Sequence, residues 1–402
     1  MQSEYSDASV APSAAVQAPR PLRLLLVAPS PPPYGGMALQ ARKLEKLLRA
    51  DGHLVVFFPS NFSFPQKLRI LQGLPGVRTL IRSTLMWMKL WRESGQAEVV
   101  HVLAASWLYF FTVALPVTIV GRMRGTRVVL NYRSGDARRF FRWWGWLAKP
   151  VLRLAHVITA PSEFLSELIR TRFGLPVSIV PNILDSSAFR FRQRVTLQPK
   201  LVIVRHLEKL YDIESALRAF RIIQQRHEDA SLWIAGKGSQ EEHLRRLVCT
   251  WRLQNVRFLG QVPHQDLPAI YDQCDILLNA SLVDNFPGAL LEGSAAGLVV
   301  VSTCPGGIPY MYENGTNALL VEPGNWQGLA DAVEKVLQCP SLALALTKAA
   351  LAVVQACHWG EVRRSLYHAY GFEDTDAARC TASGPGKDLD SIPMQLPRTG
   401  GA

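Results

Sequence analysis

Short apolar runs alternate with longer amphipathic segments along most of this chain. The runs Leu22–Pro29 and His53–Pro59 have the apolar content typical of strands buried on both faces of a parallel sheet. Between them, Leu39–Arg49 carries apolar residues at helical spacing, and a loop containing Gly35 and Gly36 precedes it. A strand, a glycine loop, a helix and a second strand form the opening of a parallel α/β domain.

The alternation continues through the rest of the first half. Further strands are predicted at Glu98–Leu103, Arg127–Asn131, His156–Ala160 and Val177–Pro181. The chain then turns polar from about Gln193 to Lys200, where we expect it to cross into a second domain.

The second half repeats the pattern after the apolar run LVIVR, which ends at Arg205. Further strands are predicted at Ser231–Ala235, Val256–Leu259, Asp275–Asn279, Leu298–Val301 and Ala318–Val321. Helices are predicted at Ile213–Gln225, Leu267–Gln273, Gly288–Ala296, Trp326–Leu337 and Leu342–Cys357, with a last helix from His358 to Tyr370. We therefore expect an α/β protein with two Rossmann-like domains facing each other across a cleft. Their predicted bounds are 21–192 and 193–357, followed by a crossover helix at 358–372, with disordered segments at 1–20 and 373–402.

The composition agrees with this organisation and shows that the chain is strongly basic. The chain has 402 residues, 48% of them hydrophobic, which suffices for two domains with ordinary cores. Its formal net charge is +12, so acidic partners are expected. The six cysteines show no CxxC spacing, and the first residues lack the pattern of a signal peptide. These features predict a reduced, cytoplasmic compartment.

The stretch Asn279–Pro309 carries the chemistry of the second domain. Pro287 is placed where a helix begins, and a helix start binds anions. Two carboxylates flank that position: Asp284 in the preceding loop and Glu292 inside the helix. A carboxylate does not bind an anion, but it accepts hydrogen bonds from hydroxyl groups. An anion site beside hydroxyl acceptors predicts a nucleotide-sugar ligand.

This stretch resembles the signature of retaining glycosyltransferases of the GT-B fold, family 4 (glycosyl transferases group 1). That signature is a carboxylate, seven residues, a glutamate, an alanine-rich helix, a valine strand and a GG loop. Here Asp284 stands in place of the more usual glutamate, and Glu292 is the second carboxylate. The resemblance implies that the second domain binds the donor, that the first binds the acceptor, and that the last helix crosses back to the first domain.

The resemblance also marks further residues. Arg205 and Lys209 match the family's pair facing the donor phosphates, and a guanidinium and an ammonium suit that task. Asp284 would hold sugar hydroxyls and Glu292 the ribose hydroxyls, so these four are the expected catalytic residues. The expected donor-binding residues are Gly35, Gly36, Gly236, Gln261, Val262, Asn285, Phe286, Pro287 and Gly288.

On the acceptor side, relatives usually carry a histidine near the sugar where this chain has Arg133. We assign Arg133 and Arg138 to that side. An arginine is not a base at neutral pH, so no mechanism with a histidine base at this position applies here.

We expect neither a metal nor a cofactor, the nucleotide-sugar being the substrate. The two DxD triplets, Asp374 to Asp376 and Asp388 to Asp390, both lie in the predicted disordered tail, so the support for a metal-dependent GT-A enzyme is missing. The alternative function is a catalytically inactive GT-B scaffold, which binds nucleotide-sugar or acts as a membrane-bound interaction protein.

Two segments of the first domain are basic and rich in apolar or aromatic residues: Phe64–Arg92 and Arg122–Arg153. This composition suits an anionic membrane surface, and for Phe64–Arg92 core helices with a solvated basic face are the other interpretation. Single-stranded nucleic acid also binds basic and aromatic segments such as Arg122–Arg153, but it would not explain the two carboxylates. We therefore expect a carbohydrate or lipid-linked acceptor, an anionic membrane surface and no nucleic acid as partners, with peripheral attachment at the inner face. The apolar run Ala104–Val120 is interpreted as a buried helix rather than a membrane span.

Overall fold

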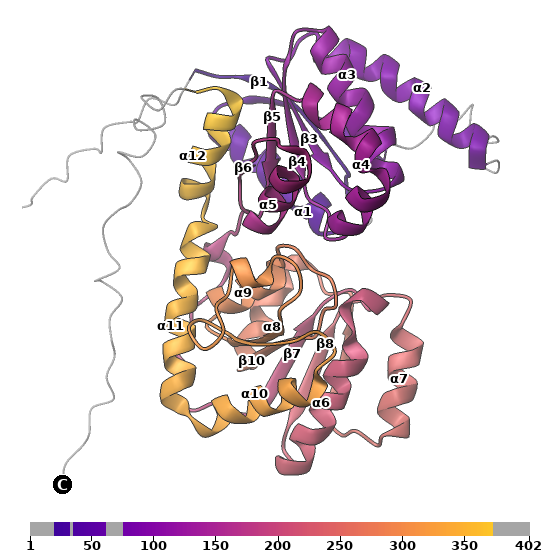
Figure 1. Ribbon diagram of the computed structural model, residues 1–402. Coiled ribbons are helices and arrows are strands. Elements are labelled where there is room, and N and C mark those ends of the chain that lie inside the picture. Colours follow the sequence, from indigo (N-terminus) through magenta and orange to yellow (C-terminus); the bar gives the residue numbers. More distant parts are fainter. Residues whose placement is uncertain (1–19, 33–34, 62–74, 373–402) are drawn as a thin grey trace, which may run out of the picture.

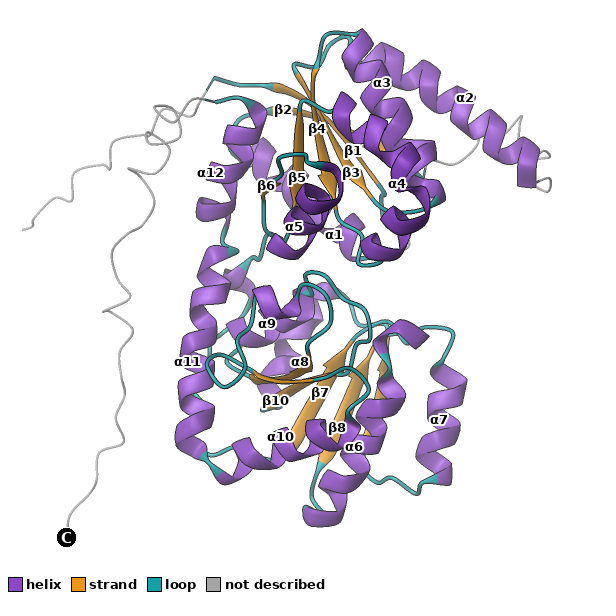
Figure 2. Cartoon of the chain, viewed as in Figure 1, coloured by secondary structure: helices purple, strands orange, loops and turns teal. Residues whose placement is uncertain are grey.

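The computed structural model describes residues 20–32, 35–61 and 75–372, and for residues 75–84 it describes only the backbone. Two domains stand one above the other, each a parallel sheet with helices on both faces (Figures 1 and 2). The predicted disordered ends lie outside the described residues, apart from position 20. The two-domain α/β architecture expected from the sequence is therefore observed.

The first sheet has six parallel strands in the order β2-β1-β3-β4-β5-β6. The strands are β1 (Arg23–Ala28), β2 (Leu54–Pro59), β3 (Val99–Ala104), β4 (Arg127–Tyr132), β5 (Val157–Ala160) and β6 (Ser178–Ile179). The helices are α1 (Gly36–Ala50), α2 (Pro75–Ser94), α3 (Leu115–Met123), α4 (Ala137–Leu154) and α5 (Glu163–Phe173). The chain order reverses between β1 and β3, and ligands of open α/β sheets bind beside such a reversal, at the carboxyl ends of the strands.

The second sheet has six parallel strands in the order β12-β11-β10-β7-β8-β9. The strands are β7 (Lys200–Val204), β8 (Ser231–Ala235), β9 (Val256–Gly260), β10 (Ile276–Asn279), β11 (Val299–Thr303) and β12 (Leu319–Val321). The helices are α6 (Ile213–Arg226), α7 (Glu241–Thr250), α8 (Leu267–Gln273), α9 (Gly288–Ala295) and α10 (Trp326–Gln338). Two more helices, α11 (Pro340–Ala356) and α12 (Trp359–Tyr370), complete the described chain. The order reverses between β7 and β10, which places Arg205 and the Asp284 loop beside each other.

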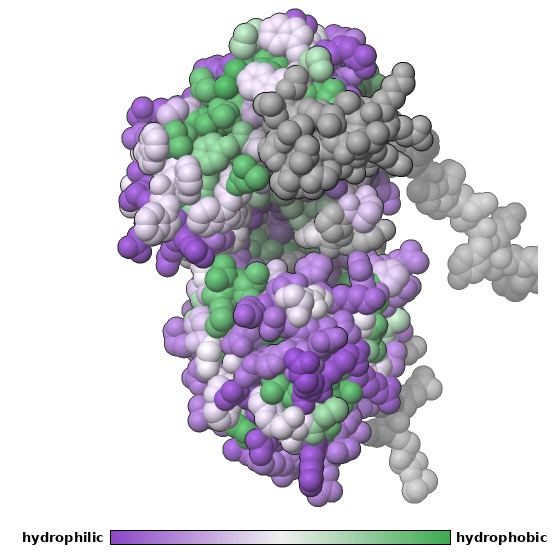
Figure 3. Space-filling view, turned by 90° about the vertical axis from the view of Figure 1, so that its right-hand side faces the viewer, coloured by the Kyte–Doolittle hydropathy of each residue, from purple (hydrophilic) through white to green (hydrophobic). Residues whose placement is uncertain are grey.

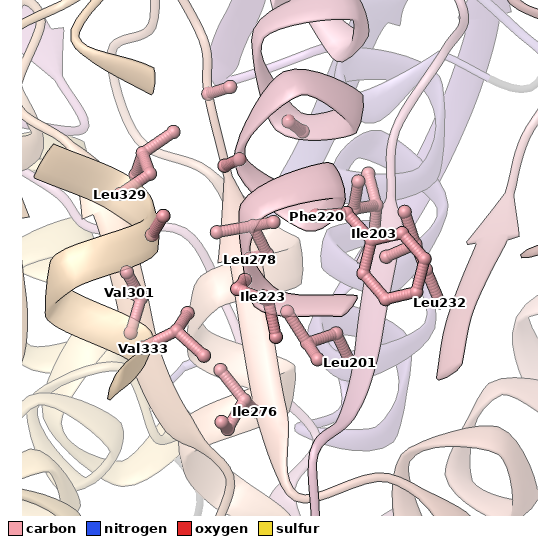
Figure 4. Packing of buried hydrophobic residues seen from close by; sticks show 14 of the residues in the cluster. Leu201, Ile203, Phe220, Ile223, Leu232, Ile276, Leu278, Val301, Leu329 and Val333 are labelled. Atoms are coloured by element: carbon pink, nitrogen blue, oxygen red, sulfur yellow. The ribbon is translucent and has the colours of Figure 1, made fainter. Parts of the chain in front are cut away.

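The core of the second domain explains why its strands read as continuous apolar runs. Leu201 of β7 and Leu278 of β10 lie beside Ile223 of α6 (Figure 4). On the same face of the sheet, Val333 of α10 packs over Val301 of β11. Burying each such side chain stabilises the fold by about 1.5–3 kcal/mol. A polar residue at one of these buried positions would lose that contribution, so these positions carry apolar residues.

Arg194 attaches the start of the second domain to its core. Its guanidinium is almost fully buried and pairs with Asp275 at 2.9 Å. It also donates hydrogen bonds to the carbonyl oxygens of Tyr271, Cys274 and Ala296 at 2.6–2.9 Å. The polar segment that predicted a linker therefore contains a buried, fully bonded charge.

The final helices connect the two domains (Figure 1). α11 packs on α9 and β11, and α12 packs on β4 and β6 of the first sheet. Tyr367 of α12 bonds His53 at 3.0 Å and Asp51 at 2.6 Å, and Tyr370 bonds His101 at 2.7 Å. Among the described residues, only the stretch Pro340–Tyr370 is long and apolar enough to cross a membrane, and it comprises these two packed helices with a break at His358.

Several local predictions need correction. The helix expected at Leu39–Arg49 begins earlier, at Gly36, with Gly35 in an extended conformation as its N-cap. The sequence did not predict α4 or α7 as helices. The run Ala104–Val120 contains the end of β3 and then a helix over Phe110–Met123 whose core side is buried, which confirms the buried interpretation. Of Phe64–Arg92, residues 64–74 lie outside the described residues.

Candidate functional site

The predicted site residues of the second domain gather at the carboxyl ends of β7 and β10. β10 ends at Asn279, and the loop that follows leads to α9. This helix begins at Gly288, and Pro287 is its N-cap rather than its first residue, a shift of one position from the prediction. The space-filling view shows a hollow between the domains on this side (Figure 3).

Arg205 and Asp284 pair directly with each other. Arg205 Nη2 lies 2.7 Å from Asp284 Oδ2, and both side chains are only 11% exposed. Arg205 Nε also donates to Asn279 Oδ1 at 3.0 Å. The sequence assigned these two residues to different parts of the donor, and the fold places them in contact with each other. Opposite charges this close and this shielded attract strongly.

Lys209 lies in a short 3₁₀ turn, Lys209–Tyr211, beside the same loop. The amide N of Leu282 donates to the carbonyl of Leu210 at 2.8 Å, so the turn and the Asp284 loop are joined by backbone. The Lys209 side chain is exposed. It is therefore free to reach an anion at the mouth of the site, as its charge predicts.

Glu292 is buried within α9 and has two partners that sequence reasoning missed. His264 Nε2 lies 2.9 Å from Glu292 Oε1, and the Tyr271 hydroxyl donates to Oε2 at 3.2 Å. Burial, together with the Glu292 charge, raises the pKa of Tyr271 well above its ordinary value. From the first domain, Lys43 Nζ of α1 comes within 3.5 Å of His264 Nε2. No spacing in the sequence signals these contacts, because they join separate elements.

Two glycines let backbone approach this cluster. A Cβ at Gly236 would collide with the carbonyl oxygen of Arg205, and its φ of +148° also favours glycine. A Cβ at Gly306 would collide with the carbonyl oxygen of Asp284. The backbones of Gly236 and Gly306 therefore lie directly against those of Arg205 and Asp284. Gly236 has this packing role whether or not it contacts a donor.

Four further donor-side predictions lie at the ends of elements. Gln261 is exposed and Val262 is half-buried, just after β9. Gly35 and Gly36 face open space at the start of α1. Their contact with a donor stays a prediction.

The first domain contacts the Asp284 loop at three points. Ser162 Oγ donates to Asn285 Oδ1. Asn182 Nδ2 donates to the carbonyl of Phe286 at 2.9 Å. A Cβ at Gly135 would lie 3.6 Å from Val283 Cγ1. The loop that carries Asp284 is therefore held from both domains.

Arg133 is less available to an acceptor than the sequence suggested. Its guanidinium is bonded to Asn182 Oδ1, and burial lowers the pKa of Arg133 to about 10, so it stays charged at neutral pH. It positions Asn182, which in turn holds Phe286. Arg138, by contrast, is exposed and lies over the Phe164 ring at 4.9 Å. Arg138 is thus the freer of the two predicted acceptor-side cations.

Within the described residues, no group of three or more His, Cys, Asp or Glu side chains is arranged to hold a metal ion. The five cysteines of that part are free thiols. Metal independence stays a prediction.

Two family models together match residues 34–353 of the chain. The model described as Glycosyltransferase Family 4 matches residues 34–188, and the model described as Glycosyl transferases group 1 matches residues 186–353. Glycogen synthase of Mycobacterium tuberculosis is 25% identical over 378 residues, covering 82% of this chain and 89% of that protein. The GPI3 subunit of phosphatidylinositol N-acetylglucosaminyltransferase from Saccharomyces cerevisiae is 32% identical over 37% of this chain and 35% of its own length.

Solved structures share the fold. Sucrose-phosphate synthase from Thermosynechococcus elongatus matches with a TM-score of 0.69 at 18% identity, covering 89% of this chain and 100% of that one. The Anabaena protein HepE in complex with UDP and glucose matches with a TM-score of 0.66 at 17% identity, covering 86% and 98%. These likenesses confirm the GT-B fold expected from the sequence.

Proposed function

Because this chain belongs to the group 1 and family 4 glycosyltransferases, we propose that it transfers a sugar from a nucleotide-sugar to an acceptor hydroxyl with retention of anomeric configuration. Its place would be polysaccharide or glycolipid biosynthesis. The UDP and glucose bound by HepE support the nucleotide-sugar class of donor.

One observation carries the proposal: two cations and two carboxylates stand together where the strand order reverses. Arg205 and Lys209 offer positive charge to a diphosphate. Asp284 and Glu292 offer acceptors to hydroxyls of the sugar and the ribose. All four lie on loops or a helix that follow β7 and β10 directly.

The proposed step breaks the bond between the anomeric carbon and the phosphate oxygen, and the acceptor oxygen bonds that carbon on the same face. The acceptor's proton passes to the departing phosphate oxygen, so no protein base is needed. Arg205 and Lys209 stabilise the charge that develops on the diphosphate. Since these residues supply the charge, we expect turnover to persist in excess EDTA.

The test is a panel of UDP-, GDP- and ADP-sugars, first for thermal stabilisation and then for release of nucleoside diphosphate. A ligand that binds only the folded state raises the melting temperature. We expect the sugars of one nucleotide class to stabilise the chain and to be hydrolysed slowly. NMR should show that the released sugar has the same anomeric configuration as in the donor. Stabilisation without release favours the alternative, an inactive scaffold. No stabilisation by any donor refutes both.

We also propose peripheral attachment to an anionic membrane at its cytoplasmic face. α2, α3 and α4 form the face at the right of Figure 1, which is turned to the viewer in Figure 3 and carries apolar and aromatic side chains. Met88, Leu108 and Met123 are more than half exposed there, beside the exposed cations Arg124 and Arg142. Each cation near an anionic surface contributes about 1 kcal/mol, screened within roughly 10 Å at 0.1 M salt. Equal sedimentation with anionic and neutral vesicles, or none, would contradict this attachment.

A further inference from the structure

Four tryptophans and one arginine line a cavity of about 430 Å³ on the outer face of the first domain. The lining residues are Trp107, Arg139, Trp143, Trp144 and Trp146. Trp107 follows β3, and the others belong to α4. The volume lies within the roughly 300–1,000 Å³ that small-molecule sites occupy.

The fold does not need these tryptophans at the surface. The inward face of α4 is completed by Phe140 and Phe141, which are fully buried. Trp143 and Trp146 remain 64% and 73% exposed. Large apolar side chains gathered around an open cavity mark a surface that another molecule covers.

The lining favours a hydrocarbon chain over a sugar or a nucleobase. Apart from Arg139 and the indole N–H groups, the lining offers few groups to bond the hydroxyls of a sugar ring. An aliphatic side chain extends the surface beyond the rings: Leu108, the residue after Trp107, is 66% exposed. Stacked bases do not require such aliphatic neighbours, whereas an acyl or isoprenoid chain is stabilised by them.

Two arginines lie against the rings that line the cavity, and their charge predicts a ligand with an anionic headgroup. Arg139 lies over the Trp107 ring at 5.5 Å, and Arg142 over the Trp143 ring at 5.9 Å. The neighbouring acid, Asp136, accepts a hydrogen bond from Trp107 Nε1 at 3.0 Å. A guanidinium fork is well suited to phosphate oxygens.

The cavity is connected to the donor side by a short chain of contacts. Trp107 at its rim bonds Asp136, the N-cap of α4, and Gly135 precedes that residue. Gly135 in turn lies against Val283 and the backbone of Asp284. A ligand whose chain occupies the cavity can therefore present its head toward the cleft beside Asp284.

We propose that this cavity holds the hydrocarbon chain of a lipid whose phosphate-linked headgroup carries the acceptor hydroxyl. The role of this lipid as the acceptor rests on the proposed function, but the lipid site itself does not. The cavity selects the apolar chain, Arg139 and its neighbours attract the phosphate, and the Asp136–Gly135 connection directs the head into the cleft.

The test uses farnesyl phosphate below its critical micelle concentration, with the full-length chain and equilibrium dialysis. We expect saturable binding to the wild-type chain and at least tenfold weaker binding to the double variant W143A/W146A. The matched control is W91A: Trp91 is 44% exposed on the same face but does not line the cavity. W91A should bind within twofold of wild type, and inorganic phosphate at equal concentration should not compete.

Four outcomes would overturn the inference. Wild type without saturable binding excludes the site, and equal loss in W91A indicates a diffuse membrane surface instead. Full displacement by inorganic phosphate indicates a phosphate site without a chain pocket. Undiminished binding to W143A/W146A places the site elsewhere. The measurement contains no nucleotide-sugar, so its failure is distinct from failure of donor hydrolysis by the wild-type chain, which tests the proposed function.

Discussion

Changing Asp284 to asparagine should separate binding of the nucleotide from handling of the sugar. Asp284 Oδ2 contacts Arg205 Nη2 at 2.7 Å. A donor diphosphate must compete with this carboxylate for the same guanidinium, and it is also repelled by it. Asparagine keeps the shape and removes the charge. Its side-chain oxygen can still accept from the Asn285 N–H, which now bonds Asp284 Oδ1 at 2.9 Å.

The magnitude follows from the geometry. Two unit charges about 4 Å apart attract by roughly 4 kcal/mol at an effective dielectric constant near 20, and desolvation offsets much of this. We take about 1.4 kcal/mol as the net interaction, which corresponds to a factor of ten in a binding constant. We therefore expect the Asp284→Asn variant to bind a nucleoside diphosphate about tenfold more tightly while sugar transfer falls strongly.

The assay is titration calorimetry with UDP, GDP and ADP, followed by turnover with the matching nucleotide-sugar. Asp272→Asn is the control, because it removes the same charge from an exposed carboxylate whose nearest cation, Arg192, lies 3.5 Å away. Thermal unfolding should show a loss of about 1–3 kcal/mol for Asp284→Asn, since Arg205 is left without its charged partner. Weaker diphosphate binding in a folded Asp284→Asn variant would refute the reasoning.

Three further changes test other parts of the site. Lys209→Met should reduce turnover by roughly a hundredfold, about 3 kcal/mol of transition-state stabilisation, with little change in melting temperature; near-normal turnover would remove the phosphate assignment. Glu292→Gln should weaken nucleoside diphosphate binding and narrow the preference for ribose over 2′-deoxyribose; an unchanged preference places the ribose elsewhere. Burial lowers the pKa of His101 to about 3. Below about pH 6.5 the imidazole of His101 is therefore protonated in the unfolded chain and neutral in the folded chain. Stability should fall as pH drops from 6.5 to 5, by about 2 kcal/mol from this residue, and His101→Gln should flatten that slope in denaturant titrations. An identical slope in both proteins would exclude His101 as the cause.

The sequence determined the elements and the class of chemistry, because those signals are local. Continuous apolar runs such as the one ending at Arg205 require a strand buried on both faces, whatever its neighbours are. The spacing of Asp284 and Glu292 around a helix start is likewise contained in one stretch of chain. The two-domain architecture and the family membership inferred from these patterns are confirmed.

Tertiary structure decided which groups meet. Arg205 pairs with Asp284, and Glu292 binds His264 and Tyr271, although no spacing along the chain joins them. Arg133 was interpreted as an acceptor-side cation, yet the fold places it against Asn182. Such contacts depend on the order in which parallel strands lie in a sheet, and that order is set by packing between distant segments. Apolar periodicity indicates that a side chain is buried or exposed, but only the assembled sheets determine its partner.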